Sequence, residues 1–353
     1  MTRDSALQRF AWRKWSYSGL KKRIDGAHEP GENEAKGGYD ESKAVTSSTD
    51  FPDITVDTGS TANDSTDADS TDTDSTRSGR GRVFFPDRPS GREFGSLVHT
   101  LLERFDPNTA EFMNNVETEL RRRPRTISQA VVPQLLEGFE RMVRSPLGSL
   151  FGGRTLAEIP GTNRRAEVTF EMRLPRAIGL DAIGQVMAAH LPPDDPLLPF
   201  ATKLKEQPKL VSMAGSLYGE IDALFRVPNA TGSDSYVLVD YKTDVVHPNG
   251  SSSPLDHYAP DALARAMIKE KYVLQVVLYA VALHRYLGMR LPAYEPQTHF
   301  GGVAYLYVRG MTGPEGPKTA DGEPYGIMSW KPPVRFLEDL DDLFAGESIR
   351  GNR

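Results

Sequence analysis

Two aspartates and a lysine in neighbouring segments have the types and spacing needed for metal-assisted hydrolysis. Asp222 lies in GEIDALFRV (219–227), and Asp240 and Lys242 lie in YVLVDYKT (236–243). Carboxylate oxygens are ligands that Mg²⁺ and Mn²⁺ prefer, and a cation beside an ammonium can polarise a phosphodiester and supply a hydroxide-like nucleophile. The lysine can orient the attacking water or offset the charge that develops on phosphorus. These side chains therefore indicate a candidate hydrolytic site.

Both segments have the pattern of β-strands, and the intervening PNATGSDS (228–235) is typical of a hairpin turn. Alternation along a strand predicts Asp240 and Lys242 on one face and Tyr241 on the other. On the first strand it predicts a polar face with Tyr218, Glu220, Asp222 and Leu224, and an apolar face with Ile221, Ala223, Phe225 and Val227. If the polar faces meet, Asp222, Asp240 and Lys242 converge. A solvated Asp/Lys pair on the open face of a surface hairpin is the alternative.

This arrangement resembles the PD-(D/E)xK nuclease superfamily, in which an Asp on one strand is followed by acidic-x-Lys on the next. Here the residues are Asp222 and then Asp240, Tyr241 and Lys242. The resemblance implies an α/β fold with a central mixed β-sheet flanked by helices, which is the restriction-endonuclease-like core.

A histidine that could join this site lies in a predicted helix, GREFGSLVHTLLERF (91–105). Its apolar residues form one helical stripe: Phe94, Leu97, Val98, Leu101, Leu102 and Phe105. His99 is expected at the edge of the stripe or beyond it, with Glu103 on the same face. One interpretation is that His99 binds the same cation. Glu103 would then either hydrogen-bond a ligand of that cation or add a further acidic group. The other is a structural histidine.

A second polar pair lies in a long predicted helix over 256–290, broken once before Tyr272. Residues 273–283 are apolar on nearly every side, which predicts a buried helix. Gln275 and Tyr279 share one of its faces. They either reach over the sheet edge to the metal site or the DNA backbone, or Gln275 is a core amide with satisfied hydrogen bonds. Further strands are expected at 165–175 and in HFGGVAYLYVRG (299–310).

Composition divides the 353 residues into four segments. Residues 1–24 are basic and aromatic, and we expect this segment to be where a helicase was once joined to the nuclease. Residues 25–85 are acidic and of low complexity, and we expect a disordered linker because they cannot bury enough apolar surface. Residues 86–346 form the nuclease domain, and 347–353 a tail. The Asp repeats of residues 25–85 lack the fixed Gly and terminal Glu of a calcium loop.

Several function classes are excluded or disfavoured. The absence of cysteine excludes a disulfide framework and a thiolate zinc or iron–sulfur site. No phosphate loop of the G-x-x-x-x-G-K-[ST] type occurs, so we expect a nuclease domain separated from its ATP-driven helicase. No signal-peptide core follows Met1, and no apolar run predicts a membrane span, so a cytoplasmic, nucleoid-associated protein is expected. The net charge of −6 disfavours DNA binding, but much of it lies in the linker.

Seven sequence blocks make the resemblance more specific, to the C-terminal nuclease domains of the RecB family, the exodeoxyribonuclease V beta subunits of RecBCD helicase–nucleases. They occur in the order WSYSGL, GSLVHTLLE, GEIDALFR, LVDYKT, YVLQVVLYAVALHRYL, HFGGVAYLYVRG and FAG. They cover nearly all of 94–346 and a short N-terminal motif. The resemblance implies a DNA nuclease that acts in double-strand-break end processing and recombinational repair. A catalytically silent module that docks in a helicase–nuclease complex and contacts DNA is the alternative.

The resemblance also implies residue roles and partners. Metal binding falls to His99, Asp222, Asp240 and the backbone carbonyl of Tyr241. Lys242 corresponds to the catalytic lysine, and Gln275 and Tyr279 match a Q-x-x-x-Y motif that supports the site. The implied cofactor is Mg²⁺, with Mn²⁺ as a substitute and Ca²⁺ as an ion that binds without supporting catalysis. The implied partners are single-stranded DNA or duplex ends, and RecC-like, RecD-like or separate helicase subunits.

Overall fold

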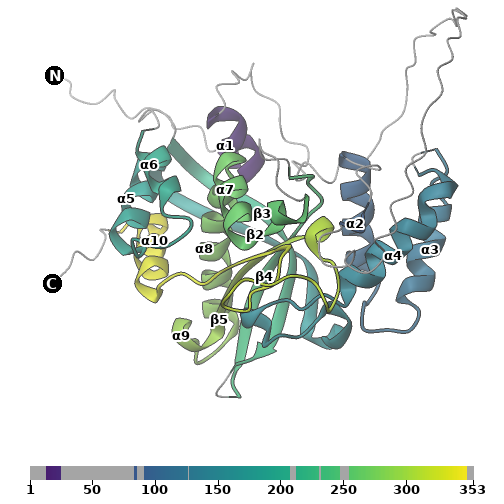
Figure 1. Cartoon of the computed structure of the whole chain (residues 1–353). Coiled ribbons are helices and arrows are strands. Elements are labelled where there is room, and N and C mark those ends of the chain that lie inside the picture. The colour runs from purple at the N-terminus through teal and green to yellow at the C-terminus, as the bar shows by residue number, and fades with distance from the viewer. Residues whose placement is uncertain are drawn as a thin grey trace, which may run out of the picture.

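The computed structural model describes residues 13–24, 83–85, 91–125, 127–206, 212–229, 232–246 and 254–347 (Figure 1). Nearly all of the predicted linker, residues 25–82, lies outside the described residues. The first twelve residues and the tail from residue 348 also lie outside them.

The described residues contain a six-stranded mixed sheet, which confirms the predicted fold class. Its strands are β1 (Arg13–Trp15), β2 (Arg164–Gly179), β3 (Ser212–Pro228), β4 (Asp234–Lys242), β5 (Phe300–Tyr307) and β6 (Ile327–Trp330). The predicted hairpin is confirmed as β3 and β4, which pair antiparallel from Ala223 opposite Val239 to Pro228 opposite Asp234. β4 then pairs parallel with β5, and β5 antiparallel with β6.

The long strand β3 organises the sheet. One of its edges pairs antiparallel with β2 along most of its length. Its other edge pairs with β4 through its C-terminal half and with β1, in parallel, at Gly215–Leu217. Between these two partners, from Tyr218 to Asp222, this second edge carries neither β1 nor β4. The candidate site lies at this change of partner.

Helices cover both faces of the sheet (Figure 1). One face packs against α2 (Arg92–Arg104), α3 (Phe112–Arg121) and α4 (Val132–Val143). The other packs against α1 (Tyr17–Ile24), α5 (Leu180–His190), α6 (Pro199–Lys205), α7 (Pro260–Lys269), α8 (Tyr272–Arg290) and α10 (Val334–Ala345). The four-residue α9 (Pro296–His299) leads into β5. Because apolar layers lie on both sides, β4 is buried on both faces rather than alternating between core and solvent.

The long predicted helix is broken where expected. α7 ends at Lys269 and α8 begins at Tyr272, with Lys271 in the left-handed conformation at φ 63° between them. The segment Val273–Leu283 is buried along its whole length, as its apolar pattern predicts. α8 has the length and composition of a membrane span, but 67% of its most apolar window is buried inside the fold. It is the central core helix of this domain.

The N-terminal segment is tied to the sheet although about sixty residues separate it from the next described residue. Trp15 and Leu20 are buried in the core that contains α8. The Trp15 indole N–H donates to the Ala214 carbonyl at 2.8 Å. α1 therefore lies beside the end of β4 that carries Lys242, and its side chains are available to the candidate site.

Candidate active site

The strands β3 and β4 separate at Asp222. Their pairing stops at Ala223 opposite Val239, and the Asp222 Oδ2 atom accepts a hydrogen bond of 2.8 Å from the Tyr241 N–H. On the β2 side, Glu167 has φ 53°, and the pairing passes from Ala166–Ala223 to Val168–Ile221 without it. The carboxylate therefore satisfies a backbone donor that has lost its strand partner, and this fixes Asp222 against β4.

This distortion changes the predicted alternation of β3. Ala223, Phe225 and Val227 belong to the core that contains α2–α4, as one apolar face requires. Ile221 was predicted on that face, but it packs in the opposite core, with α8. The prediction for Ile221 was wrong because the strand rotates at Asp222. A regular two-residue alternation does not allow for such a rotation.

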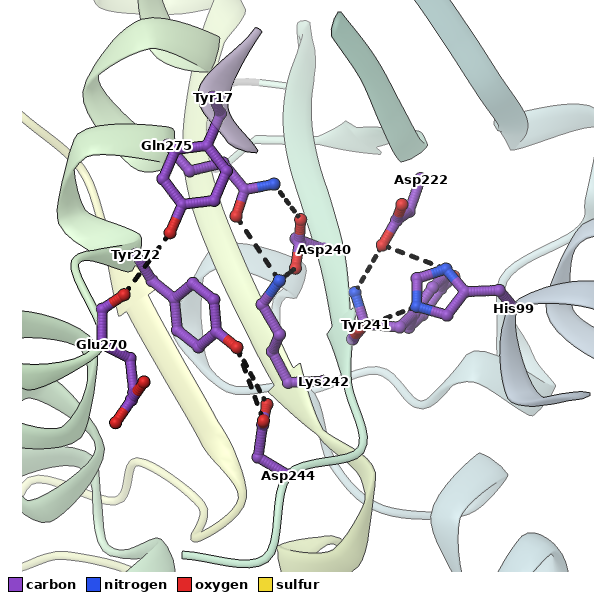
Figure 2. A network of polar contacts seen from close by, with 10 residues as sticks. All are labelled: Tyr17, His99, Asp222, Asp240, Tyr241, Lys242, Asp244, Glu270, Tyr272 and Gln275. Carbon is purple, nitrogen blue, oxygen red and sulfur yellow. Dashed lines mark hydrogen bonds and ion pairs between the residues drawn. The ribbon is translucent and has the colours of Figure 1, made fainter. Parts of the chain in front are cut away.

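His99 reaches the site from α2. Its Nε2 atom, when protonated, donates to the Tyr241 carbonyl at 3.1 Å, and its Nδ1 atom lies 3.5 Å from Asp222 Oδ2 (Figure 2). The expected place at or beyond the edge of the apolar stripe is wrong in one respect, since His99 is buried, with 4% of its surface exposed. Strand β4 covers the imidazole on the side that a helical wheel treats as open.

The buried His99 and Asp222 side chains shift each other's pKa across 3.5 Å. Burial alone would lower the pKa of His99, but the carboxylates of Asp222 and Asp240 raise it above the ordinary histidine value. Burial would raise the pKa of Asp222, but the imidazole, Lys242 and the Tyr241 N–H lower it below the ordinary aspartate value. The proximity of the two groups therefore favours the charged form of each, against the effect of burial.

Asp240, Lys242 and Gln275 form the other half of the network. The Lys242 ammonium lies 2.7 Å from Asp240 Oδ1 and donates to Gln275 Oε1 at 3.4 Å. The Gln275 amide donates to Asp240 Oδ2 at 3.0 Å. All three side chains are buried. Gln275 thus holds the carboxylate and the ammonium in one fixed geometry. Of the two interpretations of Gln275, this favours the one in which the side chain reaches the candidate site.

Two tyrosines enclose the lysine. The Lys242 Nζ atom lies 4.2 Å from the ring centroid of Tyr272 and 5.3 Å from that of Tyr305. Sequence reasoning missed Tyr272, although its spacing from Gln275 is a signal, because residues three apart share a helix face. The aromatic faces stabilise the ammonium in a site that is mostly shielded from water.

Replacing Tyr272 by leucine is expected to lower kcat about ten-fold, because loss of a partly desolvated cation–π contact costs about 1.4 kcal/mol and frees Lys242 to change rotamer. Tyr272→Phe keeps the ring and loses the long 3.4 Å contacts of its hydroxyl with Asp244, so its kcat should stay within about two-fold of wild type. Single-turnover DNA cleavage by the two variants separates the ring from the hydroxyl. Equal loss in both would contradict this role for the ring.

The network opens into a cleft of about 570 Å³. Lys21 of α1 and Arg92 of α2 line it together with His99, Lys242 and Tyr272. Lys21 lies 5.2 Å from the Tyr272 ring centroid and 3.9 Å from the exposed carboxylate of Glu270. The basic and aromatic N-terminal motif thus supplies one wall of the cleft. Interleaved basic and aromatic residues were the signal for it.

Two further predicted site residues lie on α8 and α2. Tyr279 follows Gln275 by one turn, and its ring packs edge-on against Phe170 with centroids 5.2 Å apart. Glu103 is exposed on α2, and among the described residues it makes no hydrogen bond or ion pair with the site. The i, i+4 spacing from His99 therefore does not bring the Glu103 carboxylate to the cation ligands.

Gly219→Ala is expected to destabilise the fold by about 1–3 kcal/mol, because small-to-large changes in a packed core force neighbours to move. A Cβ there would lie 2.6 Å from Phe170 Cζ and 3.1 Å from Tyr279 Cε1. Urea denaturation measures the change, with Gly288→Ala as control, since its Cβ would meet only Tyr294 Cδ1 at 3.7 Å. A Gly219→Ala protein as stable as wild type would contradict the packing of Tyr279 over β3.

The donor atoms around His99 suit a divalent cation by their chemical type but not by their present spacing. No three His, Asp or Glu side chains in the described part of the chain are gathered closely enough to hold a metal as they stand. The chemistry nevertheless fits: His99 Nδ1 is buried without a hydrogen-bond partner, and Asp222 lies beside it. Carboxylates and a backbone carbonyl suit Mg²⁺ and Mn²⁺, and the imidazole favours Mn²⁺ of the two. Asp240 would have to exchange its contacts with Lys242 and Gln275 for the same ion.

Comparisons with known proteins agree with the resemblance seen in the sequence. The sequence profile of the PD-(D/E)XK nuclease superfamily matches residues 77–348. The chain is 37% identical over 276 residues to the RecBCD enzyme subunit RecB of Mycolicibacterium smegmatis, which covers 74% of this chain and 24% of that protein. The RecB of Mycobacterium tuberculosis is 37% identical over 273 residues, covering 72% of this chain and 24% of the relative.

A more distant relative shows the same pattern. The RecBCD enzyme subunit RecB of Escherichia coli is 28% identical over 261 residues, covering 74% of this chain and 20% of that subunit. The aligned region thus amounts to about a quarter of the length of the mycobacterial relatives. The resemblance read from the seven sequence blocks is confirmed.

Proposed function

The chain belongs to the PD-(D/E)XK nuclease superfamily, and from this membership we propose that it hydrolyses DNA phosphodiester bonds with a divalent cation during the processing of broken DNA ends. The observation that carries the proposal is a pair of buried polar clusters at neighbouring positions of β4. One joins His99, Asp222 and the Tyr241 backbone, and the other joins Asp240, Lys242 and Gln275. Burying these charged groups costs free energy, and the cleft beside them gives a substrate access.

The proposed cofactor is Mg²⁺, with Mn²⁺ as a substitute and Ca²⁺ as an ion that binds without supporting cleavage. His99, Asp222, Asp240 and the carbonyl of Tyr241 would hold it. When bound, such a cation supplies Lewis-acid polarisation of the scissile phosphate and lowers the pKa of a bound water.

The side chains of the chain itself have separate tasks in this proposal. Lys242 places its ammonium where charge develops on the phosphoryl oxygens and orients the attacking water. Asp240 and Gln275 hold Lys242 in the required rotamer, through the contacts of 2.7 and 3.4 Å. Asp222 fixes the Tyr241 backbone and so aims its carbonyl at His99. The tyrosine rings beside Lys242 keep bulk water from the ammonium.

We assign the cleft to the DNA strand next to the scissile phosphate. Lys21 and Arg92 supply cations for the flanking phosphates, and Tyr17 and Tyr272 supply aromatic faces for bases. Single strands and frayed duplex ends fit these contacts, because their bases are free to stack.

The relatives are named as subunits of the RecBCD enzyme, and by analogy we propose that the chain works with helicase partners of the RecC or RecD kind, or with a separate motor protein. A motor that delivers the strand would compensate for the weak DNA affinity expected of an acidic chain. Such a role places the protein in the cytoplasm, at the nucleoid.

Incubation of the full chain with linear single- and double-stranded DNA tests the proposal. We expect loss of DNA with Mg²⁺ or Mn²⁺, none with EDTA, and none with Ca²⁺. Binding of DNA without cleavage under every metal condition would favour instead the catalytically silent docking module.

A further inference from the structure

A second recess, of about 680 Å³, lies at the opposite end of α8 from Gln275. Its polar lining consists mainly of Arg164 and Arg165 from β2, Arg226 from β3, Tyr236 from β4, and Tyr286 and Arg290 from α8. Four arginines and no acidic side chain line it. In a chain of net charge −6, this is a local reversal of sign.

The fold brings these residues together from three strands and one helix. Arg226 stands directly across from Tyr236 in the β3–β4 ladder, and Arg165 pairs with Leu224 on the other edge of β3. Tyr286 and Arg290 are one turn apart, with the guanidinium 5.6 Å from the ring centroid. The cluster is therefore fixed by rigid elements rather than by a loop.

Half of this positive charge is available to a ligand. Arg164 is engaged elsewhere, because its Nη2 atom donates to the Phe105 carbonyl at 2.9 Å. Arg226 is exposed, bonded to Asn163 Oδ1 and 3.6 Å from the equally exposed Asp234. Arg165 and Arg290 are exposed and form no ion pair with any described residue. Two unpaired guanidinium groups thus flank an open pocket that also presents two tyrosine rings.

We propose that this recess is a second DNA-binding site, which holds the phosphodiester backbone of a single strand away from the cleavage site. Guanidinium groups bind phosphate through paired N–H donors, and tyrosine faces stack on unpaired bases. The choice of DNA as ligand rests on the proposed function. Rings interleaved with arginines favour a nucleic acid over an acidic protein segment, which offers no bases to stack.

The spacing suits a strand that engages both sites. Gln275 and Arg290 are fifteen residues apart on α8, which is about 22 Å at the helical rise. The recess would therefore bind nucleotides several positions from the scissile bond. It would increase the affinity for long strands without changing the chemical step.

Binding measurements on the full chain in EDTA test the proposal without cleavage. A fluorescent oligo(dT) of about thirty nucleotides is the probe, and the variant is Arg165→Gln/Arg290→Gln. We expect its Kd to rise roughly ten-fold at low salt. The slope of log Kd against log salt concentration should fall by about 1.4, because each phosphate contact of a single strand contributes about 0.7 to that slope. Arg154→Gln/Arg176→Gln removes the same charge from exposed positions outside the recess, and should change Kd less than about two-fold.

Cleavage of a trinucleotide, too short to occupy both sites, should be equal in wild type and both double variants. If the recess variant and the charge-matched control bind oligo(dT) equally well, the proposal is wrong. That result would mean that the recess binds no DNA, whether it binds nothing or binds a protein. Absence of cleavage in the wild type would instead refute the proposed nuclease function, while the EDTA measurement would still decide the recess.

Discussion

Replacing Asp240 by asparagine is expected to lower DNA cleavage in Mg²⁺ by about 10³-fold, because one substitution removes a proposed cation ligand and the carboxylate beside Lys242. In the structure Asp240 Oδ1 lies 2.7 Å from the ammonium, and Oδ2 accepts from Gln275. Asparagine has nearly the same volume and can still accept from Gln275, but it leaves the buried Lys242 ammonium without its counter-ion, so a lowered Tm is expected and cleavage is compared below it.

Single-turnover kinetics at saturating enzyme measure this loss, and circular dichroism checks the fold. Asp181→Asn is the matched control, since Asp181 lies in the first turn of α5, away from the site. Cleavage by Asp240→Asn within about ten-fold of wild type would remove Asp240 from the chemistry.

Lys242→Met should lower kcat by at least about 10²-fold, with a much smaller change in DNA affinity, because an ammonium that stabilises developing charge acts mainly in the transition state. The variant also leaves Asp240 buried without its cation, and breaking a buried ion pair costs about 3–5 kcal/mol. A lowered Tm should therefore accompany the lost activity.

Assays below the Tm of the variant separate the two effects. Lys205→Met removes an exposed lysine at the end of α6 and should change neither kcat nor Tm measurably. A Lys242→Met protein whose cleavage is restored by a saturating DNA concentration would show that Lys242 binds substrate rather than assisting hydrolysis.

Much of the fold follows from local pattern. The β3–β4 hairpin is specified by two alternating segments and a turn rich in Gly and Asn. The buried helix α8 is specified by an apolar run without a polar face, and its start by the break at Lys271. These features depend on residues close in sequence, which is why the sequence predicts them.

The remaining features depend on contacts between distant segments. The rotation of β3 at Asp222 arises where β1, β2 and β4 compete for its edges, and no strand period encodes it. His99 is buried because β4 covers it, across 142 residues of chain. The Pro-punctuated segment after Ala177 contains α5 and α6, whose apolar faces are recognisable only once the sheet they cover is known.

The position of the N-terminal motif at the site also depends on contacts between distant segments. Lys21 reaches the cleft only because β1 docks on β3 and Leu20 of α1 is buried in the core. Its basic and aromatic composition is visible in the sequence, but its place beside Lys242 is a tertiary fact. Motif spacing identified the carboxylates and the lysine, whereas the wall of the cleft had to be seen in three dimensions.

The central claim is that His99, Asp222, Asp240 and the Tyr241 carbonyl bind one cation beside Lys242. Crystals of the protein grown with Mn²⁺ test it directly through an anomalous difference map at the manganese edge. The account predicts one strong peak about 2.0–2.3 Å from donor atoms of these residues, lost in Asp222→Asn crystals. A manganese peak bound elsewhere, or no peak at a Mn²⁺ concentration that supports cleavage, would contradict it.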